Sequence, residues 1–193
     1  MCGLIIRFVR ADDSAALLRI YAGYIDTPVT FECALPSDRA FAERIAAISA
    51  EYPYLVCEEE GAVVGYAYAH RQRDREAYQW NAELSVYLDP AYTRQGLGGR
   101  LYRILLDMLR LQGIRTVYAG VTVPNPASER LHESMGFVRL GTYHSTGYKA
   151  GGWHDVAWFE KAIAPYTANP EPPLPISQID REQLEEIIRR HTQ

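Results

Sequence analysis

The run VYLDPAYTRQGLGGRL, from Val86 to Leu101, constrains this chain more than any other segment. Its pattern predicts a strand that ends at Leu88, a glycine-rich turn, and the first turn of an amphipathic helix. The start of a helix has unpaired N–H groups and a partial positive charge, so the amides from Gln95 to Gly99 can surround a phosphate group. A plain tight turn explains the glycines equally well. The spacing matches neither a dinucleotide-binding GxGxxG loop nor a nucleotide P-loop.

The run does resemble the pyrophosphate loop of the GNAT acetyltransferases, whose pattern is Gln/Arg-x-x-Gly-x-Gly/Ala, with Gly96 and Gly98 as its glycines. Thr93 departs from the first position, which affects one side-chain contact because most donors of the loop are backbone amides. Further segments resemble the phosphinothricin acetyltransferase family: ELSVYL at 83–88, NPAS at 125–128, LHESMGF at 131–137, GYK at 147–149 and WHD at 153–155. The resemblance covers about residues 5 to 163. It implies an α+β GNAT fold, with a mixed, mostly antiparallel central sheet flanked by helices.

The length of 193 residues suits one domain with a sizeable core and an appendage. We expect a GNAT acetyltransferase domain over 1–164, followed by a proline-rich linker and a short C-terminal helix over 165–193. Asp180 and Gln183 form a capping-box-like start for that helix. A helix this short either docks on the domain or on a partner, or frays as a tail.

Composition argues against several classes of protein. The net charge of −4 gives no support for binding nucleic acid. The chain has no apolar run of ~18 residues, so we expect neither membrane insertion nor secretion, and a cytoplasmic location. Cys2, Cys33 and Cys57 lack CxxC spacing or a histidine at metal-ligand spacing. We therefore expect reduced, buried thiols and no metal site.

Apolar periodicity and turn residues predict the order of the elements: strand, two helices, three strands, helix, strand, helix and two strands. Ser37 is the expected N-cap of the second helix, and Gly113 the expected end of the long helix after the glycine turn. The strands are expected at 4–9, 54–58, 62–70, 80–88, 116–123, 137–143 and 155–159. Two of them, joined at Glu59–Gly61, form a hairpin.

Acetyl transfer from a thioester to an amine needs a base for the amine, donors for the thioester oxygen and an acid for the leaving thiolate. Strand alternation places Glu83 on the face opposite the apolar residues of its strand, so it faces a cleft. The alternative is a structural ion pair with an arginine. With the family resemblance, Glu83 is the predicted general base. The resemblance also makes His132 the candidate acid, since a histidine titrates near neutrality, although a half-exposed surface histidine is the plainer interpretation.

The resemblance also implies a set of contacts to coenzyme A. The strand backbone would hold the pantetheine arm, with the N–H of Leu88 as oxyanion donor, in the manner of strand addition. The loop would hold the pyrophosphate, while Asn125 and Ser134 would contact the arm and the adenosine end. These residues can equally be a helix N-cap and a surface hydroxyl. The complete predicted coenzyme set is Val86, Tyr87, Leu88, Arg94, Gln95, Gly96, Leu97, Gly98, Gly99, Asn125 and Ser134.

The acceptor side is predicted from an arginine and a group of aromatic residues. Arg75 aligns with the family's Arg-x-Ala-Tyr segment and is the candidate for a substrate carboxylate, since a guanidinium matches it with two bonds. Arg71 and Arg73 are interpreted as a solvated loop. The pocket walls are expected from Phe31, Tyr78, Trp80, Lys149 and Trp153, although such aromatics commonly belong to a core.

Together these features predict an N-acetyltransferase that uses acetyl-CoA and acetylates the α-amino group of a small amino-acid-like substrate, such as phosphinothricin or methionine sulfoximine. Two alternatives stay open: another amine acceptor, namely a polyamine, an aminoglycoside or a protein N-terminus, or a non-catalytic coenzyme A binding module. Retention of both Glu83 and His132 counts against the last. Family members commonly form homodimers, so we expect one here.

Overall fold

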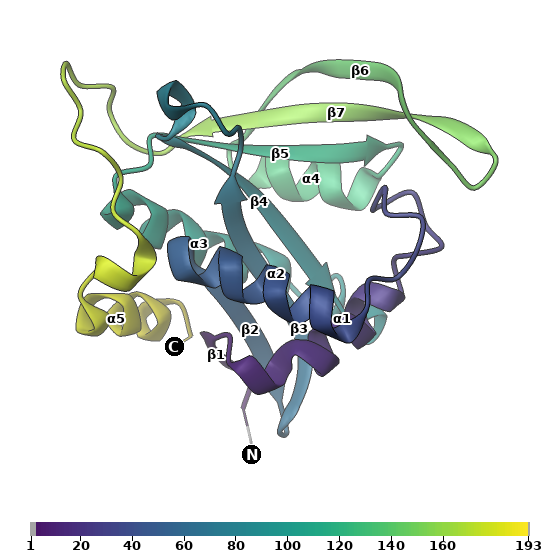
Figure 1. Ribbon diagram of the computed structural model, residues 1–193, viewed down its shortest axis with the longest axis horizontal. Helices are drawn as coiled ribbons and strands as arrows, with labels where there is room; N and C mark the ends of the chain where they lie inside the picture. Colours follow the sequence, from purple (N-terminus) through teal and green to yellow (C-terminus); the bar gives the residue numbers. More distant parts are fainter. Residues whose placement is uncertain (1–2, 193) are drawn as a thin grey trace.

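The computed structural model describes residues 3–192, so Cys2 lies outside the described residues. The elements follow the predicted order (Figure 1). The strands are β1 (Ile5–Phe8), β2 (Tyr54–Glu59), β3 (Ala62–Arg71), β4 (Asn81–Leu88), β5 (Thr116–Val123), β6 (Val138–Lys149) and β7 (Gly152–Ala162). The helices are α1 (Ser14–Ala22), α2 (Asp38–Glu51), α3 (Leu97–Gln112), α4 (Pro126–Ser134) and α5 (Arg181–Thr192). No helix in this part of the chain is long and apolar enough to cross a membrane.

The strands form one sheet in the order β1-β2-β3-β4-β5-β7-β6. Neighbouring strands are antiparallel except β4 and β5, which are parallel. The parallel pair needs a crossover connection, and α3 supplies it between β4 and β5. The expectation of a mixed, mostly antiparallel sheet flanked by helices is therefore confirmed.

The predicted caps form as the sequence indicates. The hydroxyl of Ser37 accepts a hydrogen bond from the N–H of Ala40 at 3.2 Å, which fixes the start of α2. Gly113 follows α3 with a φ of 92°, a left-handed conformation that favours glycine. These local signals explain why the ends of both helices could be located from the sequence.

The sheet carries a separate apolar core on each face. On β2, Leu55 and Cys57 face α3, whereas Tyr54 and Val56 face α1 and α2, as the two-residue period of a strand requires. Figure 1 shows α1 and α2 in front of the sheet. Successive side chains of β4 and β5 therefore point alternately towards the α3 layer and towards the α1 and α2 layer. A side chain on one face can contact only ligands bound on that face of the sheet.

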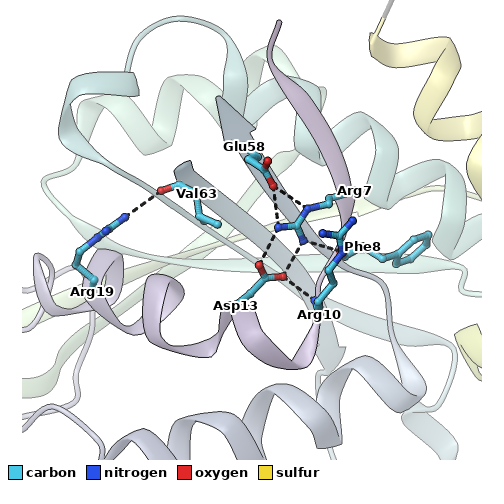
Figure 2. Close-up of polar contacts among 7 residues, drawn as sticks. All are labelled: Arg7, Phe8, Arg10, Asp13, Arg19, Glu58 and Val63. Carbon is cyan, nitrogen blue, oxygen red and sulfur yellow. Dashed lines mark hydrogen bonds and ion pairs between the residues drawn. The ribbon is translucent and has the colours of Figure 1, made fainter. Parts of the chain in front are cut away.

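An ion-pair network fixes β1 to the start of α1. Arg7 donates to Asp13 at 2.7 and 2.8 Å and to Glu58 at 3.0 Å, so one guanidinium joins β1, β2 and the turn before α1 (Figure 2). Burial alone would raise the pKa of Asp13, but the hydrogen bonds from Arg7 and from the N–H of Arg10 lower it below its ordinary value. Asp13 is therefore the buried anion that the Arg7 cation requires.

The C-terminal segment belongs to the same core as the rest of the chain. Helix α5 lies against α3 and β1 (Figure 1). Its Leu184 and Ile187 are buried in the α3-side core. The N–H of Gln183 donates to the Asp180 carboxylate at 3.0 Å, which caps the start of the helix. The helix is docked on the domain, and the alternative of a frayed tail does not hold for residues up to Thr192.

Two sequence-based expectations differ from the structure. Strands β6 and β7 extend well beyond 137–143 and 155–159, because they pair with each other while most side chains of β6 stay exposed and give no apolar alternation. Cys33 is exposed in the loop between α1 and α2, so the expectation of burial is wrong for it and right for Cys57. Among the described residues, no cluster of three His, Cys, Asp or Glu side chains is arranged to hold a metal ion.

Candidate active site

Strands β4 and β5 separate from each other in the middle of the sheet. They pair only from Asn81 and Thr116 to Glu83 and Tyr118. Beyond this point β4 stays paired with β3 as far as Leu88, and β5 stays paired with β7 as far as Val123. A wedge-shaped opening therefore begins directly after Glu83, and β4 presents an unpaired backbone edge to it.

A cavity of about 250 Å³ occupies this opening. Its walls come from the loop after α1, from both separating strands, and from α3 and α4. The lining residues are Val29, Thr30, Phe31, Glu83, Leu84, Ser85, Val86, Tyr87, Tyr102, Ala119, Gly120, Val121, Thr122, Asn125, Ser128 and His132. Both predicted catalytic residues, Glu83 and His132, thus lie in one cavity.

Glu83 lies on β4 opposite His70 of β3 and points to the α1 and α2 side of the sheet. Burial raises the pKa of Glu83, and the nearby His70 opposes this shift. No arginine pairs with Glu83 among the ion pairs of residues 3–192, so the alternative of a structural arginine pair does not hold. A half-buried carboxylate of raised pKa is suited to accepting a proton.

His132 is buried on α4, with only 2% of its surface exposed. Its Nδ1 lies 2.8 Å from the carbonyl oxygen of Ser128, which can only accept, so Nδ1 carries the hydrogen. The Nε2 atom then has a free lone pair, and it has no hydrogen-bond partner within the described chain. Burial lowers the pKa of His132, against the effect of the Ser128 hydrogen bond, and this favours the neutral ring.

Tyr102 of α3 lies beside His132, with the two ring centres 5.5 Å apart. Its side chain is buried, and burial is the main cause that raises the pKa of its hydroxyl, with a further contribution from Glu83. The hydroxyl is therefore protonated at neutral pH and able to donate. Tyr102 could not be predicted as a proton donor from the sequence, because a tyrosine in the apolar stripe of a helix is typical of a core residue.

The structure corrects the expectation for Leu88. Its N–H donates to the Tyr24 hydroxyl at 3.1 Å, and the same hydroxyl donates to its carbonyl at 2.7 Å. Leu88 is therefore not a free oxyanion donor. The N–H of Asp89 donates to Val64, so alternation along the ladder directs the backbone groups of Val86 away from β3 and into the opening. Val86 is the residue of β4 whose backbone is available to a ligand.

The glycine loop ends on a left-handed residue. Gly96 has a φ of 77° and precedes α3 without any side-chain cap, and the first turn of α3 contains no acidic residue. The N–H groups of that turn are thus left for a ligand or water. Thr93 and Gln95 bond instead to the carbonyls of Pro90 and Ala91, which stabilises the loop from within.

The other predicted coenzyme residues have structural partners of their own. A side chain at buried Gly98 would contact Leu131 of α4 at 3.4 Å, so this glycine allows α3 and α4 to approach. Asn125 lines the cavity while its side chain caps α4 through the N–H of Ser128. Ser134 lies in a separate hollow between α3 and α4, beside Arg103 and Lys161.

Two further hollows continue the site on the α1 and α2 side of the sheet. A cavity of about 240 Å³ shares Phe31, Glu83 and Gly120 with the central one. A cavity of about 210 Å³ shares Tyr143 and Trp158 with the second. The lining of the third is Gln72, Arg73, Tyr118, Leu140, Gly141, Tyr143 and Trp158. We call the second and third cavities together the acceptor side.

Only one of the predicted acceptor residues lines these cavities, and it is Phe31. Its ring rests on Gly147 of β6, where a side chain would approach the ring atoms to 2.4 Å. The buried Lys149 donates to the carbonyl of Thr30 at 2.5 Å. Lys149 therefore holds the loop that carries Phe31, and it is not itself a lining residue.

The segment after β3 also differs from the expectation. Arg75 is exposed at the start of a short 3-10 turn (Glu76–Tyr78) and lines none of the three cavities. Arg73 is exposed, as the interpretation of a solvated loop requires, but it also lines the acceptor side. Its guanidinium lies 5.4 Å from the centre of the Tyr78 ring. Tyr78 contributes through that contact.

The predicted pocket tryptophans also lie elsewhere. Trp80 donates to the Glu171 carbonyl at 2.9 Å, so it anchors the C-terminal linker. Trp153 is 66% exposed. Trp158, which is not among the predicted pocket residues, forms part of the wall of the second cavity instead. Strand alternation alone did not show which of these tryptophans would face the opening.

Sequence comparisons relate the chain to known acetyltransferases. The family described as "Acetyltransferase (GNAT) domain" matches residues 6–158. The phosphinothricin N-acetyltransferase of Streptomyces viridochromogenes is 39% identical over 175 residues, covering 90% of this chain and 95% of its own. The L-methionine sulfoximine/L-methionine sulfone acetyltransferase of Salmonella typhimurium is 34% identical over 169 residues, covering 84% and 96%.

Among solved structures, the fold is similar to a GNAT superfamily phosphinothricin acetyltransferase from Sinorhizobium meliloti in complex with AcCoA. The TM-score is 0.82 at 32% sequence identity, and the match covers 91% of this chain and 99% of the other. The similarity therefore extends through nearly the whole of that protein.

Proposed function

Because the chain belongs to the GNAT acetyltransferase family, we propose that it transfers the acetyl group of acetyl-CoA to the α-amino group of a small amino-acid-like substrate, with Glu83 as general base. The observation that carries this proposal is the opening after Glu83, where a carboxylate of raised pKa lies beside an unpaired strand edge. A proton acceptor and free backbone donors are the parts that acetyl transfer to an amine requires.

The residues on the α3 side of the opening fit coenzyme A. The backbone of Val86 offers an N–H and a carbonyl to the amides of a pantetheine arm. The uncapped first turn of α3 offers N–H groups to a pyrophosphate, and Gly96 gives the backbone the left-handed turn that exposes them. When bound, acetyl-CoA supplies the activated acetyl group. Through these contacts the chain positions the acetyl group within the opening.

Glu83 acts from the opposite side of the sheet. An amino group in the acceptor side lies next to the carboxylate, which takes its proton as the nitrogen becomes bonded to carbon. The raised pKa of Glu83 brings the carboxylate closer to the pKa of the ammonium it must deprotonate. Holding both reactants in one opening supplies a further part of the acceleration.

The proton for the leaving thiolate comes from the pair His132 and Tyr102. The neutral His132 has a lone pair at Nε2 and must first gain a proton before it can donate, whereas the Tyr102 hydroxyl carries its proton already. We therefore assign the donation to Tyr102 and a supporting role to His132.

Gly96→Ala tests the coenzyme site. An alanine is strained at a φ of 77°, so the loop should rearrange and acetyl-CoA should bind about tenfold more weakly, as for one lost hydrogen bond to a charged group. Gly61→Ala is the matched control, since Gly61 has a φ of 81° and equally open surroundings in the β2–β3 turn. Both variants should lose similar stability, by roughly 1–2 kcal/mol. Equal coenzyme affinity in the two variants, measured by calorimetry, would refute this placement.

Glu83→Gln tests the base. The amide cannot accept the proton, so kcat should fall by roughly 10²–10⁴ while acetyl-CoA still binds. In the natural protein, activity should decline as the pH falls through the raised pKa of Glu83, because the protonated carboxyl cannot act as base. This acidic limb should disappear in the variant, whose rate should rise towards the pKa of the free amine. A normal kcat at neutral pH would contradict the assignment.

Tyr102→Phe and His132→Asn identify the acid. Removing the Tyr102 hydroxyl should lower kcat about 10²-fold. This is the lower end of the range for general acid catalysis, because a thiol is a good leaving group. His132→Asn should have a smaller effect on kcat. Pre-steady-state thiol release measures both rates. The reverse order of effects would return the role to His132, as the sequence predicts.

Arg73→Ala and Arg75→Ala decide which arginine binds the acceptor carboxylate. Arg73 lines the acceptor side and Arg75 does not, so Arg73→Ala should raise the acceptor KM by at least tenfold, the scale of about 1.5–3 kcal/mol for a charged hydrogen bond. The KM for acetyl-CoA should not change. If Arg75→Ala raises the acceptor KM and Arg73→Ala does not, the assignment to Arg75 from the sequence is right.

A further inference from the structure

We propose that Gly120 determines the size of the acceptor side, and that this side is built for an α-amino acid with a long apolar or aromatic side chain. The inference rests on the proposed function, because it takes Glu83 as the group that meets the amine. It concerns the part of the acceptor beyond the reacting nitrogen.

Gly120 contributes only backbone to the walls of the central and second cavities. It lies on β5 between Tyr118 and Thr122, on the face turned away from α3, and it is exposed. Its partner across the ladder is Trp158 of β7. A Cβ at this position would lie 3.4 Å from Cη2 and 3.5 Å from Cζ2 of the Trp158 ring. The indole therefore reaches along the bare backbone of Gly120.

Gly120 also joins the central and second cavities. It lines both of them, as do Glu83 and Thr122. The volume of about 240 Å³ in the second cavity corresponds to about eight water molecules, which exceeds what the side chain of alanine needs. A branched residue at position 120 would occupy the passage between the reacting centre and this volume.

The lining of the second cavity indicates the chemistry of the side chain that fills it. Phe31, Tyr143, Val156 and Trp158 supply apolar and aromatic surface. Glu83 is its single carboxylate within the described chain, and it is needed for the amine. A second cationic group would find no partner there, which disfavours polyamines and basic side chains. Arg73, in the adjoining third cavity, suits an anionic group of the acceptor.

A different explanation of Gly120 is local packing. An aromatic residue opposite a glycine can simply cover the exposed backbone of a sheet. In that case a side chain at position 120 would affect every acceptor equally. The size of the acceptor therefore separates the two explanations.

The test compares alanine, methionine and phenylalanine as acceptors for the natural protein and for Gly120→Ala and Gly120→Val, by thiol release from acetyl-CoA. The natural protein should prefer methionine and phenylalanine to alanine by at least tenfold in kcat/KM. Gly120→Val should lower kcat/KM for these two by at least tenfold and for alanine by less than threefold. Gly120→Ala fits at ordinary contact distance and should give an intermediate, fully folded variant.

Gly152→Val is the matched control, because Gly152 is also a strand glycine of this sheet but has open surroundings outside the cavities. It should leave all three acceptors and the melting temperature unchanged. An equal loss for alanine and phenylalanine in Gly120→Val, or a natural preference for alanine, would overturn the inference while leaving the proposed function intact. If the natural protein acetylates no α-amino acid of any size, the proposed function fails, and this inference with it.

Discussion

The separation of β4 from β5 is the constraint on which the site depends. A sheet normally satisfies its backbone groups by pairing, and unpaired groups away from water are costly. Here the parallel pair stops at Glu83, while β5 continues beside β7 and β4 continues beside β3. The antiparallel neighbours hold the two strands apart, so the unpaired edge is a property of the whole sheet. The Tyr24 hydroxyl forms hydrogen bonds with both backbone groups of Leu88. This leaves the backbone groups of Val86 available to a ligand.

Much of this fold could be predicted from short-range sequence patterns. Apolar periodicity gave the order of the elements, and short-range signals such as the Ser37 cap and Gly113 gave the helix ends. Glu83 could be identified because a carboxylate on a central strand conflicts with its surroundings. What the sequence could not show are contacts between distant residues. Trp80 donates a hydrogen bond to the carbonyl of Glu171, and Lys149 donates one to the carbonyl of Thr30. The periodicity of apolar residues carries no information about such long-range partners.

A group of stacked tyrosines covers the face of the sheet from which Glu83 projects. Tyr54, Tyr66 and Tyr68 stack on one another, and Tyr87 stacks on Tyr66. These rings fill the α1 and α2 face of the same strands that carry Glu83. Their apolar bulk excludes water from one side of the carboxylate, and their stacking leaves little freedom for β3 and β4 to move. Burial, which raises the pKa of Glu83, is thus a consequence of how this face is packed.

The alternation of side chains along β4 and β5 has an evolutionary consequence. Residues that face α1, α2 and β6 line the acceptor side, whereas the backbone of Val86 points into the opening and the start of α3 belongs to the other layer. A substitution at a position such as Gly120 or Trp158 can therefore alter one face without disturbing the other. A lineage with this architecture can acquire new acceptors by single exchanges on one surface, while the machinery for the shared donor is inherited unchanged.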